Sequence, residues 1–351
     1  MDNSSTSSSK PLPGTRVVES RTHVLRVATF LLGALLIDRG LGWLFQSAST
    51  QVVHGETMKH VNVAPAYMRD GIVVFGSSRA AHHVDPQVLS DQTGLTAYNA
   101  GSNGQSISFH RALQELLLQQ PERPRLFVLQ LDALDINRPL PAVRSLVLAP
   151  FMDRSAEARK LVLQSDPRAW IKQLSLTWRF NSLIHQFSGG MRSTPEHGNQ
   201  FHPLSGVMDE RRVAEATRRI AQQSIEPRPV EETTAALEMH RDFIRRAREN
   251  NIDVVLLVGP RLLRRSDWEG DAVLLLQQMA AEEHVPLLQF DEDKYPVFRD
   301  PTVYCDKDHL NGRGATLLTG LLSDHIREIS SSRGQHSAHL NQANRPEDPL
   351  R

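Results

Sequence analysis

The chain has 351 residues, 40% of them hydrophobic, and its 40 basic side chains balance 40 acidic ones. This length allows one large globular domain with appendages, and the zero formal net charge gives no support to nucleic acid as a partner. A single cysteine, Cys305, excludes an internal disulfide framework and a cysteine-based zinc site.

The segment 1–23 is rich in serine and threonine and shows no periodicity, which predicts a disordered, cytoplasmic N-terminus. An apolar stretch follows at 24–45 and has about the length of a helix that crosses a bilayer. Basic residues near its start, among them Arg21 and Arg26, keep the N-terminus in the cytoplasm by the positive-inside tendency. We therefore expect a single-pass anchor in a bacterial inner membrane, with the rest of the chain outside the cytoplasm.

Two alternatives to this anchor stay open. Asp38 and Arg39 interrupt the apolar stretch, so its uninterrupted part is short. A cleaved signal peptide also fits, although the residues at 46–49 are only faintly like a cleavage site. An amphipathic helix of a soluble domain is the third interpretation.

A polar connector at 46–69 leads into a region, 70–329, where buried strands alternate with amphipathic helices. This alternation predicts an α/β fold with a doubly wound, mostly parallel sheet. The irregular part at 137–231 indicates an insertion that covers the functional site of this domain from above. The polar tail at 330–351 is predicted to be disordered. The expected strands lie at 72–76, 95–99, 125–131, 254–258 and 286–290, and the expected helices at 80–90, 108–119, 233–250, 271–283 and 315–326.

A serine follows the first expected strand. The run from Ile72 to Phe75 is typical of a strand buried on both faces, and it stops at Gly76, Ser77 and Ser78. Glycine permits a sharp strand-to-helix turn that exposes a hydroxyl at the edge where parallel sheets bind ligands. Taken alone, the same residues also fit a serine that caps the next helix.

A carboxylate and an imidazole lie close together near the C-terminal end. Asp306 and His309 belong to the pattern D-x-x-H-L-N-x-x-G, directly before an apolar-periodic run. Three residues apart on a turn, they can form a hydrogen bond with each other. A carboxylate on one imidazole nitrogen leaves the other nitrogen free to take a proton from a serine.

These two blocks resemble those of the SGNH/GDSL hydrolase superfamily, whose nucleophile follows the first strand and whose Asp-x-x-His block lies near the C-terminus. The resemblance implies a flavodoxin-like, three-layer sandwich. It implies Ser78 as the nucleophile, with Asp306 and His309 as the other members of a catalytic triad. Ser77 stands where many members have aspartate.

A second glycine-bearing turn, at 99–106, follows the second expected strand. In the family, a glycine of this turn and the nucleophile donate backbone N–H groups to the oxyanion, and Gly104 fits that position here. The alternative is a plain turn residue between strand and helix. Asn103 in the same turn and Arg79 beside Ser78 are candidate substrate-binding residues, although an arginine at a helix start is as often solvated.

The third block departs from the family pattern. Its fullest form has G-x-N-D after the third strand, and the asparagine donates to the oxyanion, whereas this chain has no such motif. Asn137 is the candidate replacement, and a carboxylate at Asp132 or Asp135 would oppose catalysis unless it is paired or turned away. In lacking this motif, the chain resembles the membrane-anchored branch of the family. That branch serves acylation of the cell envelope and includes D-alanyl transfer and alginate O-acetylation proteins. The resemblance is at the level of motifs and covers about 70–135 and 250–328.

The resemblance implies an extracytoplasmic serine esterase or acyltransferase that acts on acyl esters of an envelope polysaccharide or related glycoconjugate. It implies no cofactor, and it makes a membrane-bound acyltransferase a candidate partner. The histidine pairs lack a third ligand at metal-site spacing, so no metal is predicted. Two alternatives remain: a degenerate SGNH-like scaffold protein of an envelope complex, and a plain Rossmann-like domain in which Ser78 and His309 lie far apart.

Overall fold

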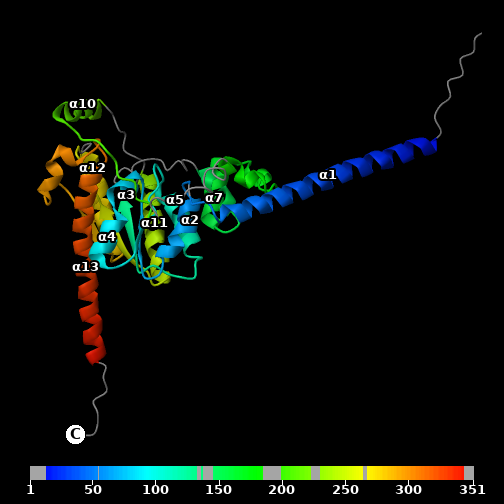
Figure 1. Ribbon diagram of the computed structural model, residues 1–351. Helices are drawn as coiled ribbons and strands as arrows, with labels where there is room; N and C mark the ends of the chain where they lie inside the picture. Colours follow the sequence, from blue (N-terminus) through cyan, green and yellow to red (C-terminus); the bar gives the residue numbers. More distant parts are fainter. Residues whose placement is uncertain are drawn as a thin grey trace, which may run out of the picture.

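The computed structural model describes residues 13–53, 55–132, 136, 145–184, 199–222, 230–263 and 267–343. At its centre lies a five-stranded sheet of order β2-β1-β3-β4-β5, in which every neighbouring pair is parallel (Figure 1). The predicted α/β fold with a parallel sheet is confirmed, and each expected strand is present with small shifts of its bounds. The strands are β1 Ile72–Phe75, β2 Ala97–Asn99, β3 Leu126–Leu131, β4 Asp253–Val258 and β5 Leu287–Gln289.

Helices cover both faces of the sheet and produce a three-layer arrangement (Figure 1). Side chains alternate along β1, so Val73 and Phe75 pack into one layer while Ile72 and Val74 pack into the other. Every residue of β1, β2 and β3 is buried because both faces meet helices. The first layer contains α2 Met58–Val63, α5 Ile107–Leu117, α7 Ala156–Ser165, α11 Val230–Glu249 and α12 Asp267–Glu282; the second contains α3 Ser78–His83, α4 Pro86–Thr93 and α13 Gly312–Ala343.

Further helices lie outside these two layers or at their edges. They are α1 Pro13–Ser49, η1 Ala64–Tyr67, η2 Ser145–Phe151, α8 Ala169–Lys172, η3 Trp178–Leu183, α10 Glu210–Ala221, η4 Pro296–Arg299 and η5 Pro301–Val303. The described parts of the predicted insertion, 145–184 and 199–222, hold η2, α7, α8, η3 and α10.

The strand order gives β1 a special position. From β1 the chain crosses to β2 on one side and then returns to β3 on the other. In open parallel sheets, ligands bind beyond the carboxyl ends of the strands at such a reversal. The turn after Phe75, which contains Ser77 and Ser78, therefore lies where a site is expected.

The helix predicted at 80–90 is in fact two helices, α3 and α4. The residue before a proline disfavours the helical conformation, and Asp85, which precedes Pro86, has extended backbone. Its carboxylate accepts hydrogen bonds from the backbone N–H groups of Gln87 (2.9 Å) and Val88 (3.4 Å) and thereby caps α4. Since α3 ends before this break, it is a short helix that reaches from Ser78 only to His83.

Two helices are longer than predicted. α1 begins at Pro13, within the segment 1–23 predicted to be disordered. Proline suits the first turn of a helix, and no further proline interrupts the chain before Pro65. α13 continues to Ala343 and so extends into the predicted disordered tail at 330–351. No proline interrupts it over that length.

α1 projects from the domain and contains the whole predicted anchor, 24–45 (Figure 1). Among the helices of the described part of the chain, none combines the length and the apolar character that crossing a membrane requires. The transmembrane helix predicted at 24–45 is therefore not found.

The C-terminal part of α1 packs against the domain instead. The Asp38 carboxylate accepts hydrogen bonds from the backbone N–H groups of Leu176 (2.9 Å) and Thr177 (3.1 Å). Arg39 donates to the backbone carbonyl of Leu174 at 2.9 Å. Asp38 and Arg39, which interrupt the apolar stretch, are thus hydrogen-bonded to the turn before η3. The part of α1 before Asp38 projects from the domain.

Two histidines, His110 of α5 and His240 of α11, are buried between these helices and the rest of the domain. The His110 ring makes edge-on contacts with the rings of Phe75 and Phe109, at centroid distances of 6.2 and 5.4 Å. Burial, with a smaller contribution from His240, lowers the pKa of His110 to about 3. Burial also lowers the pKa of His240 to about 4, although its hydrogen bond with the Ala236 carbonyl acts in the opposite direction. Both imidazoles are therefore neutral in the folded protein.

We predict that His110→Phe makes the stability less sensitive to acid. In the unfolded chain the imidazole binds a proton near pH 6.5, whereas in the fold it does so only near pH 3, so the unfolded state binds more protons between these values. The free energy of unfolding should therefore fall with decreasing pH, by about 1.4 kcal/mol per pH unit for each such histidine. Urea unfolding between about pH 7 and pH 5 should show this slope reduced in His110→Phe. The exposed His284→Asn is the control, and an equal slope in both variants would contradict the prediction.

Candidate active site

The turn after β1 brings Ser78 to the carboxyl edge of the sheet. Gly76 has a φ of 143°, and a Cβ atom there would lie 2.8 Å from both the Ala80 side chain and the Gln130 carbonyl. Only glycine fits this close approach, so the chain can turn directly from β1 into α3. Ser77 is the N-cap residue of α3 but makes no capping hydrogen bond with its side chain. Ser78, the first residue of the helix, is half-buried and faces the site.

The structure brings Ser78, His309 and Asp306 together as the sequence predicts. Ser78 Oγ lies 2.8 Å from His309 Nε2. His309 Nδ1 lies 3.0 Å from each carboxylate oxygen of Asp306. In this arrangement Nδ1 donates to the carboxylate and Nε2 accepts from the serine hydroxyl.

The Asp306 carboxylate is held in its ionised form. Burial would raise its pKa, but hydrogen bonds from the His309 side chain and from the backbone N–H groups of Asp308 and His309 outweigh burial and hold the pKa well below the usual range. Both backbone N–H groups donate to Oδ1 at 2.8 Å. A fixed negative charge therefore faces one side of the His309 ring and orients it.

The loop that carries His309 is attached to the far end of α3. The backbone N–H of Leu310 donates to His83 Nε2 at 3.0 Å. His83 is fully buried, and burial, together with the nearby charges of Arg79 and His309, holds its pKa well below the usual range. His83 is thus a neutral acceptor. Because α3 begins at Ser78 and ends at His83, one short helix positions both sides of the Ser78–His309 contact.

The remaining residues of the D-x-x-H-L-N-x-x-G pattern fix the same loop. The Asn311 side chain donates to the carbonyls of Thr302 (2.8 Å) and Gly206 (2.9 Å), and its oxygen accepts from the Gly314 N–H (3.1 Å). A Cβ atom on Gly314 would lie 2.2 Å from the Val303 carbonyl, which leaves room for glycine alone. The pattern therefore encodes a loop conformation as well as the Asp306–His309 pair.

The predicted oxyanion turn packs against the Ser78 turn. The Ser102 N–H donates to the Gly76 carbonyl at 2.9 Å, and a Cβ atom on Gly101 would lie 2.4 Å from the Ala81 nitrogen. Gly104 lies exposed in this turn with a φ of 69°, and the neighbouring Asn103 is also exposed. Their roles as oxyanion donor and substrate-binding residue stay predictions.

A buried histidine that the sequence analysis missed supports the turn at 99–106. His60 Nε2 lies 3.1 Å from Ser102 Oγ, and His60 Nδ1 lies 3.0 Å from the Tyr98 hydroxyl. His60 comes from α2, and burial holds its pKa well below the usual range. No motif around His60 signals this contact, because its partners are far away in the sequence.

Arg79 is not solvated, and its predicted role in substrate binding stays a prediction. Its side chain is buried and forms an ion pair with Asp132, which directly follows β3, at 2.5 Å. Asp132 also pairs with Arg261, which follows β4, at 2.5 Å. The Arg261 side chain is buried as well. The Asp132 carboxylate therefore lies between two arginines and is paired, as the sequence analysis required of a carboxylate near a proposed oxyanion site.

Part of the insertion runs along the site. The segment 199–208 contacts both halves of it through backbone carbonyls. His82 Nδ1 lies 2.6 Å from the His202 carbonyl, the Gly312 N–H donates to the Leu204 carbonyl at 3.0 Å, and the Asn99 N–H donates to the Asn199 carbonyl at 3.0 Å. This segment of the predicted insertion therefore lies beside the elements that carry Ser78 and His309, and its role as a cover stays a prediction.

Cys305 is a neighbour of the site and not its nucleophile. Burial, reinforced by the Asp306 charge, raises the pKa of its thiol to about 11, so the thiol stays protonated near neutral pH. Asn137 and Asp135 lie outside the described residues. Within the described ranges, no cluster of three or more histidine, cysteine, aspartate or glutamate side chains could hold a metal ion.

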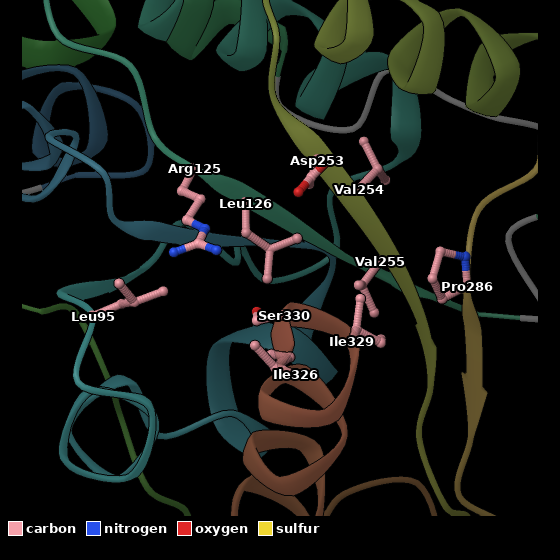
Figure 2. Close-up of a pocket in the computed structure, with 10 residues that line it drawn as sticks. All are labelled: Leu95, Arg125, Leu126, Asp253, Val254, Val255, Pro286, Ile326, Ile329 and Ser330. Atoms are coloured by element: carbon pink, nitrogen blue, oxygen red, sulfur yellow. The ribbon is translucent and has the colours of Figure 1, made fainter. Parts of the chain in front are cut away.

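A pocket seen in the structure lies away from Ser78. It is lined in part by Arg125, Leu126 and Asp253, at the amino ends of β3 and β4, and by Ile326 of α13 (Figure 2). The amino ends of parallel strands lie at the edge opposite their carboxyl ends. This pocket is therefore separate from the Ser78–His309–Asp306 site.

No protein-family model matches the chain, and no curated protein matches it. Two solved structures similar to it are a lipolytic protein of the G-D-S-L family from Desulfitobacterium hafniense DCB-2 and an acetyl xylan esterase from the rumen bacterium Butyrivibrio proteoclasticus. The first is 9% identical, with a TM-score of 0.38 over 74% of this chain and 99% of its own. The second is 10% identical, with a TM-score of 0.34 over 76% of this chain and 65% of its own. Since both TM-scores are below 0.5, a function for this chain rests on the geometry of its own residues.

The Leu310–His83 hydrogen bond can be tested with two variants of one residue. His83→Leu leaves the buried Leu310 N–H without an acceptor, at a cost of about 1–3 kcal/mol, whereas the carbonyl of His83→Gln can replace the imidazole nitrogen. Hydrogen exchange of the Leu310 amide, measured by NMR, should accelerate by roughly 10- to 100-fold in His83→Leu and much less in His83→Gln. Equal exchange rates in both variants would show that His83 does not hold this loop.

A second prediction concerns the Asp132 carboxylate, whose side chain is 12% exposed. Asp132→Asn keeps the size of the side chain but removes the charge between Arg79 and Arg261. Breaking a buried ion pair by removing one charge costs about 3–5 kcal/mol, so urea unfolding should show a loss of that order. Asp293→Asn is the control because Asp293 and Arg299 form an exposed ion pair at 3.0 Å, which contributes less than about 1 kcal/mol. Similar losses in the two variants would contradict the structural role of Asp132.

Proposed function

We propose that the chain is a serine hydrolase of the SGNH type, which cleaves or transfers the acyl group of an ester. The observation that carries this proposal is the contact of Ser78 Oγ with His309 Nε2 at 2.8 Å, with Asp306 on the other ring nitrogen. This arrangement activates a serine as a nucleophile. The two residues meet across 231 sequence positions, and a helix-capping serine would need no such partner.

In the first half of the proposed reaction, Ser78 Oγ attacks the acyl carbonyl carbon while His309 Nε2 takes the hydroxyl proton. The carbonyl oxygen becomes an oxyanion, and the backbone N–H groups of Ser78 and Gly104 are the proposed donors to it. The Ser78 N–H is available because the first N–H groups of a helix have no partner within it. The ester C–O bond then breaks, His309 returns the proton to the leaving alcohol, and the acyl group remains on Ser78.

In the second half, a hydroxyl group attacks the acyl-serine. His309 takes the proton of the incoming hydroxyl and passes it to Ser78 Oγ as the acyl group leaves. With water as the acceptor the protein is an esterase, and with a glycan hydroxyl it is an acyltransferase. Asp306 stabilises the protonated imidazole in both halves.

The third block affects the expected rate. Loss of one oxyanion donor typically lowers a rate by about 10²- to 10³-fold, and Asn137 is the proposed donor in place of the family's G-x-N-D asparagine. The pairing of Asp132 with two arginines supports activity, because it removes an unpaired carboxylate from the edge where the oxyanion would form. We expect slow turnover of simple esters.

We further propose that the substrate is an acyl ester of an envelope polysaccharide or related glycoconjugate. In this proposal the domain lies outside the cytoplasm, attached to a membrane through α1, and a membrane-bound acyltransferase is a candidate partner. The exposed apolar side chains of α1, such as Phe30 and Leu36, and the basic residues Arg21 and Arg26 support membrane attachment. The motif-level resemblance to the envelope acylation branch supports the substrate class.

A fluorophosphonate probe tests the serine chemistry, because its reaction with a serine uses the same base and oxyanion donors as acyl transfer. The wild-type protein should be labelled at Ser78 and should hydrolyse an activated acetyl ester, and Ser78→Ala should abolish both. His309→Ala should slow labelling by roughly 10²- to 10⁴-fold, the usual contribution of a general base. Ser77→Ala is the matched control, because it removes the adjacent hydroxyl and should leave most of the labelling.

Absence of labelling and of ester hydrolysis would favour the alternative of a non-catalytic scaffold protein, which the missing G-x-N-D motif supports. A folded wild-type protein that takes no label and hydrolyses no activated acyl ester would overturn the enzymatic proposal. The same conclusion would follow if Ser77→Ala and Ser78→Ala were labelled equally.

A further inference from the structure

A group of exposed apolar side chains surrounds the base of α1. Trp170, Ile171, Leu174 and Trp178 lie in α8, in the turn after it and at the start of η3, with exposed fractions of 60%, 51%, 65% and 46%. We call these four residues the apolar collar. Four large apolar side chains within nine residues form an exposed patch of the kind that marks an interaction surface.

The apolar collar and α1 form one surface. The turn between Leu174 and Trp178 is bonded to α1 through Asp38 and Arg39, as described above. A Cβ atom on Gly42 would lie 2.2 Å from Leu176 Cβ, so α1 and this turn are in direct contact. Figure 1 shows α1 leaving the domain at this point, beside the segment that follows α7.

The projecting part of α1 indicates what covers this surface. The helix positions from Val24 to Ile37 span about 21 Å at 1.5 Å per residue. Their exposed apolar side chains are spread around the helix axis rather than confined to one stripe: Val24, Leu25, Val27, Phe30, Leu31, Leu32, Leu35, Leu36 and Ile37. A protein partner covers one face of a helix, whereas a helix that is apolar on all sides matches a medium that surrounds it.

The composition of the apolar collar fits the boundary of a bilayer. Tryptophan is enriched where a membrane meets water, because its ring is apolar and its N–H is polar. Lys172, which pairs with Asp166, lies over the Trp178 ring at 5.3 Å, and Arg168 is exposed beside Ala169. A lysine or arginine next to an interfacial aromatic residue is placed to meet lipid phosphates.

We propose that the apolar collar is a lipid-contact surface. The projecting part of α1 enters a bilayer, and the apolar collar contacts the surface of the same bilayer. This inference rests on the proposed membrane attachment and is independent of the serine chemistry. It implies that the domain is held against the membrane by two elements, α1 and the apolar collar, and is not suspended from it by α1 alone.

Tryptophan fluorescence of the full chain tests the contact directly. The chain has four tryptophans, so variants that retain only Trp170 or only Trp178, with the others changed to phenylalanine, are practical. They are reconstituted into phosphatidylcholine vesicles with brominated acyl chains, and unbrominated vesicles serve as the reference. Both variants should lose most of their emission in brominated vesicles. Leu274→Trp in a chain without other tryptophans is the control and should keep its emission, because Leu274 lies in α12 at the other end of the domain (Figure 1).

A matched pair of serine variants measures the energy of the contact. Leu174 and Leu274 have nearly equal exposed fractions, 65% and 61%. Leu174→Ser should weaken vesicle binding of the full chain by about tenfold, the effect of losing one buried leucine side chain, and Leu274→Ser should not change it. Fluorophosphonate labelling of each variant is recorded in parallel, so that loss of folding and failure of the catalytic proposal are seen separately from loss of lipid contact.

Three results would overturn the inference. The first is unquenched emission from Trp170 and Trp178 in brominated vesicles. The second is equal vesicle binding by Leu174→Ser and Leu274→Ser. The third is a lipid-free dimer in which Trp178 is shielded from aqueous iodide, because a second copy of the chain would then cover the apolar collar.

Discussion

The hydrogen bond from Leu310 to His83 joins an early and a late part of the chain, and the geometry of the site depends on it. Ser78 and His83 are the two ends of α3, a helix of about two turns that cannot stretch. Its N-terminus presents the serine and its C-terminus holds the loop of His309. The distance between Ser78 and His309 is thus set by rigid backbone, and the Asp306 carboxylate has only to orient a ring that is already in place.

Much of the fold could be predicted from the sequence because each strand carries its own local signal. The run from Ile72 to Phe75 is apolar throughout, ends at Gly76 and needs no distant partner to be read as a buried strand. Ser78 and His309 could be named for the same reason, since each lies in a short motif. Their meeting is not local. It follows from the parallel sheet, which gathers the carboxyl ends of its strands at one edge, so it can be predicted only together with the fold.

The parts that could not be predicted depend on contacts between distant residues. Arg79, Asp132 and Arg261 follow three different strands, and a charged residue looks the same in a sequence whether water or a counter-ion surrounds it. The helix expected at 24–45 is part of α1, which lacks the combined length and apolar character of a membrane span. The partners of Asp38 could not be predicted either, because the N–H groups of Leu176 and Thr177 that bind its carboxylate lie far along the chain.

The 231 positions between Ser78 and His309 also set an order of events during synthesis. A ribosome adds roughly 5–20 residues per second, so Ser78 exists for some tens of seconds before its base has been made. During that time its hydroxyl is an ordinary alcohol, because a serine without a neighbouring imidazole is a weak nucleophile. Under the proposed function the long separation acts as a delay, because Ser78 gains its proposed base only after the segment with His309 has been made and has docked against α3.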